Sequence, residues 1–244
     1  MSPPAAARWL ARKIVPRQDL NALACEDSNA LACLQILEHG YGHAPSSRTQ
    51  TPIDGLGNPT PWYTYPAIAY LSQLDVSESS VFEYGAGNST LWWGARSRRV
   101  VSVESAHDWA LKVSRQADAL PVEIVEATGK DEYVLALEGV FEVIVVDGDW
   151  RGACAEQALA ALAPGGLIVL DNADWYPGTC AMLRASNLIQ VDFSGFGPVN
   201  PYTWTTSLFL HRDFCARPVG ERQPVPAVGS LTLKADDDWV GGPS

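Results

Sequence analysis

Five short apolar runs rich in valine and isoleucine constrain the fold of this chain more than any other feature. They occupy residues 81–84, 100–104, 122–126, 141–147 and 167–171. Helix-like segments, such as 109–120 and 153–162, separate most of them. Strands that alternate with helices require crossover connections, so the pattern predicts an α/β fold with a parallel sheet covered by helices on both faces.

The last two predicted strands depart from this alternation. Residues 188–193 and 205–210 are joined by a loop rich in Gly, Pro and Asn, with no helix between them. A short connection of this kind joins antiparallel strands, so we expect an antiparallel C-terminal hairpin at one edge of the sheet.

Three regions are expected along the chain. Residues 1–75 form a helical N-terminal extension with an aromatic loop, residues 76–215 form the α/β domain, and residues 216–244 form a Pro-rich acidic tail. Within the extension, the helical pattern reaches about residue 45. Gly40 and Gly42 place residues 39–47 in a loop, which continues as an ordered loop to residue 61 before a short helix at 67–71.

Composition limits the partners of a chain of this length. The 244 residues carry a net charge of −11, which argues against binding to nucleic acid because a phosphate backbone needs a basic surface. No apolar run approaches the about 18 residues of a membrane span, and no secretion signal is recognised at the start. The five cysteines show no CxxC pair, so we expect reduced thiols in a cytoplasmic protein without a membrane partner.

A glycine-rich turn follows the first strand and precedes a helix. It reads Glu83-Tyr84-Gly85-Ala86-Gly87-Asn88-Ser89-Thr90 and faces the crevice where sheets of this kind bind ligands. A dinucleotide fingerprint would need glycine at position 90, and its pyrophosphate would meet Glu83. S-adenosylmethionine has no phosphate and carries an ammonium. Glu104, roughly 20 positions after Glu83, ends the second strand and is suited to accept ribose hydroxyls.

These motifs, with Asp147 and Ala163-Pro164-Gly165-Gly166-Leu167, resemble those of class I S-adenosylmethionine-dependent methyltransferases over residues 80–210. The resemblance implies a Rossmann-like seven-stranded sheet whose last strand is antiparallel. It also implies S-adenosyl-L-methionine as the cofactor. The residues expected to bind it are Glu83, Tyr84, Gly85, Gly87, Asn88, Ser89, Glu104, Asp147 and Trp150.

Acidic residues follow the fourth and fifth strands and should meet at one rim. Asp147 and Asp149 follow the fourth strand, and Asp171-Asn172 follows the fifth. The arrangement is similar to that of metal-dependent catechol and caffeoyl-coenzyme A O-methyltransferases, which implies Mg²⁺ bound by Asp147, Asp171 and Asn172. Trp150 and Arg151 stand where that family usually has a lysine. Alternatively, Asp147 orients cofactor and substrate, and Asp171-Asn172 caps the following segment.

The predicted activity is methyl transfer to a small molecule, with oxygen as the favoured acceptor. Asp147 and Asp149 are the predicted catalytic residues at the border of the reacting centre. Aromatic side chains are expected above the same rim, where they would hold a flat or apolar acceptor: Tyr63, Tyr65, Trp175 and Tyr202. Rival hypotheses are an aminopropyl transferase, a nicotinamide oxidoreductase, and a non-catalytic partner protein. The oligomeric state stays open.

Overall fold

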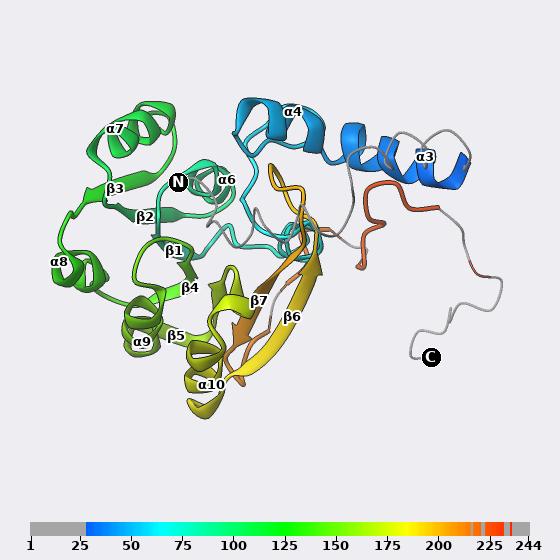
Figure 1. Cartoon of the computed structure of the whole chain (residues 1–244). Helices are drawn as coiled ribbons and strands as arrows, with labels where there is room; N and C mark the ends of the chain where they lie inside the picture. The colour runs from blue at the N-terminus through cyan, green and yellow to red at the C-terminus, as the bar shows by residue number, and fades with distance from the viewer. Residues whose placement is uncertain (1–27, 216, 221–222, 232–234, 236–244) are drawn as a thin grey trace.

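The computed structural model describes residues 28–215, 217–220, 223–231 and 235, and a seven-stranded sheet lies at its centre (Figure 1). The strand order is β3-β2-β1-β4-β5-β7-β6. The strands are β1 Ser80–Tyr84, β2 Arg99–Glu104, β3 Val122–Glu126, β4 Phe141–Val146, β5 Leu162–Leu170, β6 Ile189–Gly195 and β7 Trp204–Leu210. Strands β1 to β5 are parallel, and β7 is antiparallel to both β5 and β6. The Rossmann-like sheet and its antiparallel C-terminal pair are therefore confirmed.

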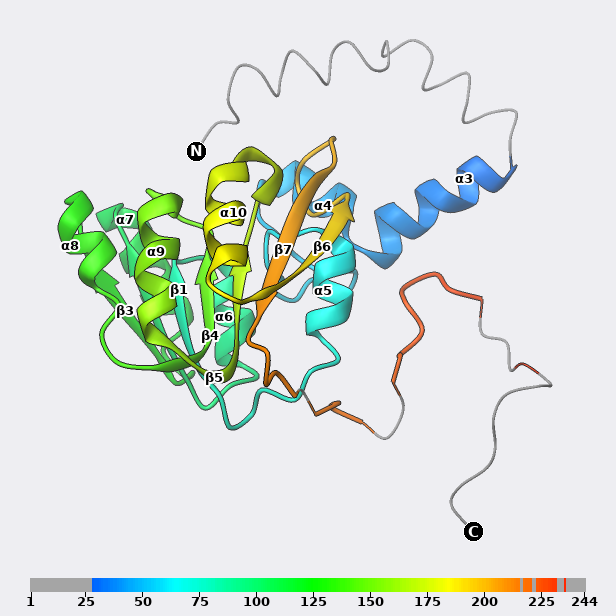
Figure 2. The same cartoon turned by 90° about the horizontal axis from the view of Figure 1, so that it is seen from below.

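Helices cover both faces of the sheet, because alternate side chains of each central strand point to opposite sides. Phe82 and Ile144 pack with helices α8, α9 and α10, whereas Val81 and Val143 pack with α5 and α6 on the other face (Figure 2). Helix α7 packs beside α6. The bounds are α5 Tyr65–Leu71, α6 Asn88–Gly94, α7 His107–Gln116, α8 Lys130–Leu135, α9 Arg151–Ala161 and α10 Pro177–Ala185, with a 3-10 turn, η2, at Ala173–Trp175.

Strand β5 begins earlier than its apolar run suggests. Phe141 of β4 pairs with Leu162 and Val143 pairs with Leu167, so residues 163–166 bulge out of the ladder. Gly165 has a φ of 79°, and a Cβ on Gly166 would come within 2.7 Å of the Glu142 carbonyl oxygen. The Ala163-Pro164-Gly165-Gly166 motif is thus a bulge that lets the chain turn before the buried part of the strand.

The N-terminal part of the described chain is more helical than predicted. Helix α3 covers Ser28–Gln35, continues as a π-helical turn, η1, at Ile36–Gly40, and is followed by helix α4 at His43–Thr49. The loop predicted for residues 39–47 is therefore wrong over α4. Gly42, with a φ of 70°, lets the chain change direction, and Pro45 lies in the first turn of α4, where a missing N–H costs no hydrogen bond.

Parts of the N-terminal extension and of the C-terminal tail lie outside the described residues. They include residues 1–27 and the predicted acidic run 236–238. The tail that is described folds back on the domain. The Asp75 N–H donates to the Arg217 carbonyl oxygen at 2.8 Å, and a Cβ on Gly40 would meet Val228. Within the described ranges, no helix has the length and apolar character needed to cross a bilayer.

Candidate functional site

Two glycines of the turn after β1 have different surroundings. Gly85 has a φ of 99°, and a Cβ there would lie 2.8 Å from the Gly148 Cα, so this glycine is required where two loops of the protein cross. Gly87 has an extended backbone, and a Cβ added to it would have only the Ser89 Oγ, at 3.9 Å, within 4 Å. Gly87 therefore leaves space for a ligand to approach, while Gly85 packs against protein.

Glu83 lies beneath this turn and shapes it. Its side chain is fully buried, and its Oε2 accepts hydrogen bonds from the hydroxyls of Thr90 and Ser102. Thr90 Oγ1 in turn accepts the Gly87 N–H at 2.8 Å. Burial raises the pKa of Glu83 to about 7, and its Oε1 has no hydrogen-bond partner. In this structure the carboxyl group supports the turn through Thr90, and the role of Glu83 in cofactor binding stays a prediction.

Glu104 brings the end of β2 to the same turn. Its Oε1 accepts the N–H groups of Ser105 and Ala106, both at 2.8 Å, and its Oε2 accepts the Ala86 N–H at 3.2 Å. The carboxylate is only partly buried. Glu104 thus lies next to the glycine turn, and its role in binding ribose hydroxyls stays a prediction.

The indole of Trp109 is a neighbour of this turn that the sequence prediction missed. Its Nε1 donates to the Ala86 carbonyl oxygen at 2.7 Å, and 38% of the residue is exposed. Trp109 lies in the first turn of α7, a few residues after Glu104. The sequence signal that would identify this position is an aromatic residue in the first helical turn after the second strand.

Other predicted cofactor residues contact protein instead of an open site. Tyr84 is fully buried and its hydroxyl donates to the Val134 carbonyl oxygen at 2.7 Å. Asn88 Nδ2 donates to the Pro52 carbonyl oxygen at 2.6 Å, and Ser89 is 6% exposed. In this structure Tyr84 fills the core, and Asn88 ties the turn to the loop before α5. The roles of Tyr84, Asn88 and Ser89 in cofactor binding stay predictions.

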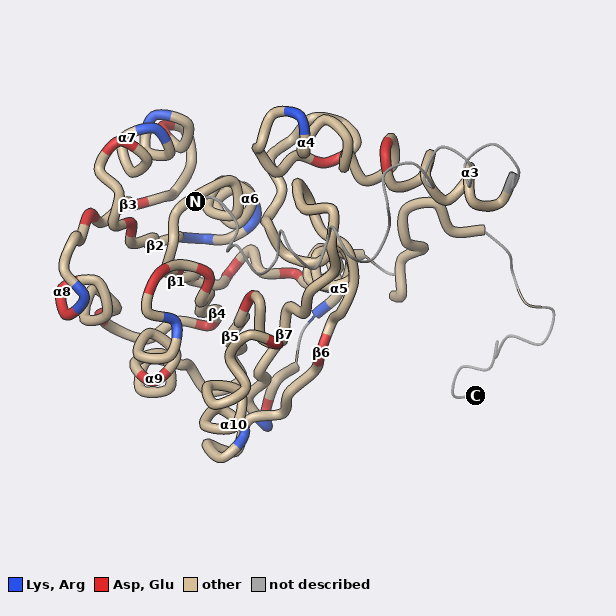
Figure 3. The backbone as a smooth tube through the Cα atoms, viewed as in Figure 1, with Lys and Arg blue, Asp and Glu red and all other residues tan. Residues whose placement is uncertain are grey.

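Asp147, at the end of β4, is paired with Arg151. Its Oδ1 lies 2.9 Å from Arg151 Nη2, and the two side chains are 17% and 13% exposed. The loop between β4 and α9 carries acidic residues and α9 begins with this basic one (Figure 3). Burial, followed by the nearby charge of Asp171, raises the pKa of Asp147 well above its usual value. The Arg151 guanidinium opposes this rise, because it stabilises the charged carboxylate.

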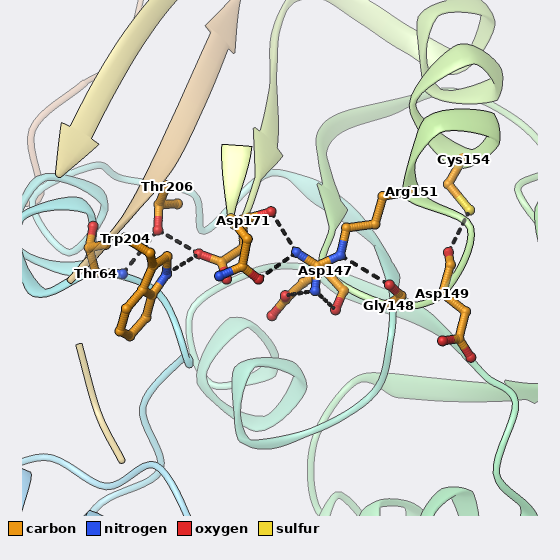
Figure 4. A network of polar contacts seen from close by, with 10 residues as sticks. Thr64, Asp147, Gly148, Asp149, Arg151, Cys154, Asp171, Trp204 and Thr206 are labelled. Atoms are coloured by element: carbon orange, nitrogen blue, oxygen red, sulfur yellow. Dashed lines mark hydrogen bonds and ion pairs between the residues drawn. The ribbon is translucent and has the colours of Figure 1, made fainter. Parts of the chain in front are cut away.

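Asp171 and Asn172, at the end of β5, are already bonded to protein groups. Asp171 Oδ1 accepts Trp204 Nε1 at 2.9 Å and the Thr206 hydroxyl at 2.6 Å, both from β7 (Figure 4). Asn172 Oδ1 accepts Arg151 Nη1 at 2.8 Å. Burial raises the pKa of Asp171 to about 6.

The predicted Mg²⁺ site does not fit these contacts. The Arg151 guanidinium lies between Asp147 and Asn172, while the Asp171 carboxylate is engaged by β7. Across the described ranges, no three His, Cys, Asp or Glu side chains converge as a metal would require. The predicted alternative, a side-chain cap, is also wrong: Asn172 is the N-cap of η2 but makes no capping bond through its side chain.

Asp149 and Trp150 complete the loop after β4. Asp149 Oδ2 accepts the Ser105 hydroxyl at 2.9 Å, which joins this loop to the end of β2 beside Glu104. Trp150 is 38% exposed, and its ring lies 5.3 Å from that of Tyr133. Asp149 therefore lies near the end of β2, and the predicted role of Trp150 in cofactor binding stays a prediction.

The four predicted acceptor-binding aromatics separate into two pairs. Tyr63 is fully buried and its hydroxyl accepts Trp93 Nε1 at 3.3 Å, and Tyr65 is 6% exposed and bonded to His43 Nδ1 at 3.2 Å. These two tyrosines are buried in this structure, and their contact with an acceptor stays a prediction. Trp175 is 44% exposed, and Tyr202 is partly exposed with its ring 6.0 Å from Trp204. Only this second pair is available to a ligand.

Comparison with known proteins gives likenesses among solved structures only. No family model and no curated protein matches the chain. A precorrin-6y C5,15-methyltransferase from Geobacter metallireducens is 12% identical, with 60% of this chain and 87% of that chain covered and a TM-score of 0.49. An rRNA methylase from Streptococcus thermophilus is 14% identical, with 59% and 93% covered and a TM-score of 0.48.

A methyltransferase from Pyrococcus furiosus is 15% identical, with 78% of this chain and 100% of that chain covered and a TM-score of 0.47. At identities this low, a shared activity does not follow from the likeness, because one fold hosts many activities.

Proposed function

We propose that this chain is an S-adenosylmethionine-dependent methyltransferase. The observation that carries the proposal is a pair of partly exposed acidic residues at the rim, Glu104 and Asp149. Ser105 joins them: Glu104 Oε1 accepts the Ser105 N–H at 2.8 Å, and Asp149 Oδ2 accepts the Ser105 hydroxyl at 2.9 Å. S-adenosylmethionine brings a sulfonium and an ammonium against one carboxylate, whereas a dinucleotide brings a pyrophosphate. An acidic rim favours the net cation.

The residues beside the glycine turn fit this cofactor. Gly87 leaves open space at its Cα, so the backbone can approach a ligand closely. Glu104 presents a partly exposed carboxylate at the end of β2, where it would accept ribose hydroxyls. Trp109, bonded to the Ala86 carbonyl oxygen, offers exposed aromatic surface beside the turn, and Trp150 offers it in the loop after β4. When bound there, the cofactor supplies an electrophilic methyl group.

The finer part of the proposal concerns the acceptor, which we take to be a hydroxyl oxygen of a small molecule. Asp147 holds a proton at its carboxyl group more strongly than an ordinary aspartate, because burial and neighbouring carboxylates raise its pKa. It is thereby suited to accept the hydroxyl proton as methyl transfer proceeds. Asp149, fixed by Ser105, is the second candidate for this step. Trp175 and Tyr202 would hold an aromatic or apolar acceptor and exclude water.

A cytoplasmic location is part of the same proposal. The described cysteines, Cys33, Cys154, Cys180 and Cys215, are all free thiols. Unpaired cysteines are typical of reducing compartments, which supports a cytoplasmic enzyme.

Calorimetric titration of the full chain with S-adenosylhomocysteine tests the proposal. We expect saturable binding by the wild type and weakened binding by Glu104→Gln. Glu123→Gln is the matched control. The exposed carboxylate of Glu123, on β3, pairs with Arg99 on the adjacent strand β2 and lies away from the turn. NAD⁺ is titrated in parallel. Binding of NAD⁺ without binding of S-adenosylhomocysteine would favour an oxidoreductase. Equal affinities in wild type and Glu104→Gln would remove the site assignment.

The acceptor is sought separately, by following S-adenosylhomocysteine formation with a panel of phenols, aliphatic alcohols and amines. Turnover of phenols or alcohols is the expected result. Turnover restricted to amines would contradict the oxygen acceptor but leave the cofactor assignment intact. Cofactor binding with no turnover on any acceptor class would favour a non-catalytic partner protein.

A further inference from the structure

Arg151 makes an unusual set of contacts for one side chain. Its Nε donates to the Gly148 carbonyl oxygen at 3.0 Å, and its Nη2 donates to the Asp147 carbonyl oxygen at 2.9 Å. Nη2 also forms an ion pair with Asp147 Oδ1 at 2.9 Å. Its Nη1 donates to the Asp171 carbonyl oxygen at 2.5 Å and to Asn172 Oδ1 at 2.8 Å. One guanidinium thus joins the loop after β4 to the loop after β5 (Figure 4).

The five acceptors of Arg151 are all oxygens: three backbone carbonyls, one carboxylate and one side-chain amide. Oxygens of these types are the ligands that a hard divalent cation prefers. In this chain they are spaced at hydrogen-bond distances from a planar guanidinium, and the five contacts use its fork of donors. The positive charge at this position is therefore part of the polypeptide.

The start of α9 holds the guanidinium in place. Trp150, the N-cap of α9, has a φ of 47°, in the left-handed region, and Arg151 is the first residue of the helix. The guanidinium also lies 5.6 Å from the centre of the Tyr176 ring. Because the side chain is 13% exposed and its donors are engaged on both loops, it has little freedom to move away.

We propose that Arg151 is the resident cation of this rim and the positioning residue for Asp147. It neutralises part of the acidic rim and fixes the Asp147 carboxyl group. It thus takes the role that a divalent ion would otherwise fill, so methyl transfer at this site needs no such ion. The link to methyl transfer rests on the proposed function, whereas the role as resident cation rests on the contacts alone.

The test compares Arg151→Ala and Arg151→Lys with Arg96→Ala. Arg96 is the matched control because its Nη2 donates to three carbonyl oxygens, those of Leu71, Ser72 and Leu74, and it faces no carboxylate in those contacts. Melting temperature and S-adenosylhomocysteine affinity are measured for each full-length protein. Both quantities are measured with EDTA, with Mg²⁺ and with a low concentration of guanidinium chloride. Sodium chloride at equal ionic strength is the reference condition.

We expect the wild-type melting temperature and affinity to be unchanged by EDTA or Mg²⁺. Arg151→Ala should bind S-adenosylhomocysteine about tenfold more weakly, because Asp147 loses its charge-assisted bonds. Free guanidinium should restore part of that affinity and raise the melting temperature of this variant. Arg151→Lys should lie between the two, since an ammonium keeps the charge but loses the fork. Arg96→Ala should lose stability with its affinity retained.

Two results would overturn the proposal. One is a wild-type protein stabilised by Mg²⁺ or destabilised by EDTA. The other is an Arg151→Ala variant that behaves like Arg96→Ala, with lower stability, unchanged affinity and no response to guanidinium. If the wild type binds no S-adenosylhomocysteine, the proposed function fails. The guanidinium effect on the melting temperature of Arg151→Ala then still decides the role of Arg151. If Arg151→Ala does not fold, Arg151→Lys and Arg151→Gln provide the same comparison.

Discussion

The two halves of the rim differ in how their polar groups are satisfied. At the ends of β1 and β2, Gly87 faces open space and the Glu104 carboxylate is only partly buried. At the ends of β4 and β5, Asp171 and Asn172 are already bonded to Trp204, Thr206 and Arg151. Adjacent strand ends with similar acidic residues can therefore serve different purposes. The first half is suited to a ligand, and the second forms a rigid wall beside it.

Removing the carboxylate of Asp171 should have the largest effect and should fall on stability. Asp171→Ala leaves the donors of Trp204 and Thr206 buried without an acceptor, and each orphaned donor costs about 1–3 kcal/mol, so we expect a loss of roughly 4 kcal/mol. Urea denaturation measures it, with Asp171→Asn as a milder control that keeps an acceptor oxygen. An Asp171→Ala protein as stable as the wild type would show that the second half is not held together as described.

Glu83 should make stability depend on pH. Its pKa is raised from 4.5 to about 7 by burial, so the folded state keeps a proton that the unfolded state releases between these values. Stability from this group is therefore present below pH 4.5 and lost as pH rises to 7, by up to about 3 kcal/mol. Glu83→Gln cannot ionise and should lose less stability between pH 5 and pH 8. Parallel curves for the two proteins, from urea midpoints, would contradict this.

Glu104→Ala should weaken ligand binding more than substitutions in the second half of the rim do. A charge-assisted hydrogen bond contributes about 2 kcal/mol, so the affinity for S-adenosylhomocysteine should fall roughly 30-fold. The variant also frees the N–H groups of Ala86, Ser105 and Ala106, so its folding is checked by circular dichroism and its binding is measured well below its melting temperature. If the folded Asp171→Asn protein lost more affinity than Glu104→Ala, the roles of the two halves would be reversed.

Substitutions of the two glycines should have the smallest effects, because each adds one methyl group. Gly87→Ala fits the fold, because its Cβ would lie 3.9 Å from the Ser89 Oγ, so it should keep wild-type stability. Its affinity for S-adenosylhomocysteine should still fall by about 1 kcal/mol, because the methyl occupies space next to the ligand. Gly85→Ala should do the opposite and lower the melting temperature, because its φ is 99° and its Cβ would meet Gly148. Unchanged affinity in Gly87→Ala would place the ligand elsewhere.

The part of the molecule that follows local patterns was predictable from sequence. The central strands are short apolar runs, the turn has its glycines, and Glu104 follows at the spacing that places it at the next strand end. Thr90, which argued against a dinucleotide, has a positive reason in the structure: its hydroxyl links the Gly87 N–H to Glu83. Sequence reasoning could not supply that link because it depends on the direction of a buried side chain.

What sequence reasoning missed depends on contacts between distant residues. Thr206, the partner of Asp171, also accepts the N–H of Thr64, which lies 142 positions earlier. Tyr63 and Tyr65 were expected at the surface of the site, but α5 packs on the sheet and buries them. In the sequence, Arg151 departs from the metal-dependent pattern. Its five oxygen partners could not be predicted, because they depend on how the loops after β4 and β5 lie relative to each other.

Hydrogen exchange of the full chain, with and without S-adenosylhomocysteine, tests most directly that the ligand binds the first half of the rim. The predicted result is slower exchange of the amides of residues 85–90 and 104–109, with little change in β7 at Trp204–Leu210, whose contacts exist without ligand. Slower exchange confined to other parts of the chain, such as the groove lined by Ile36, His39 and Val228, would contradict it. So would exchange that the ligand does not alter at the glycine turn.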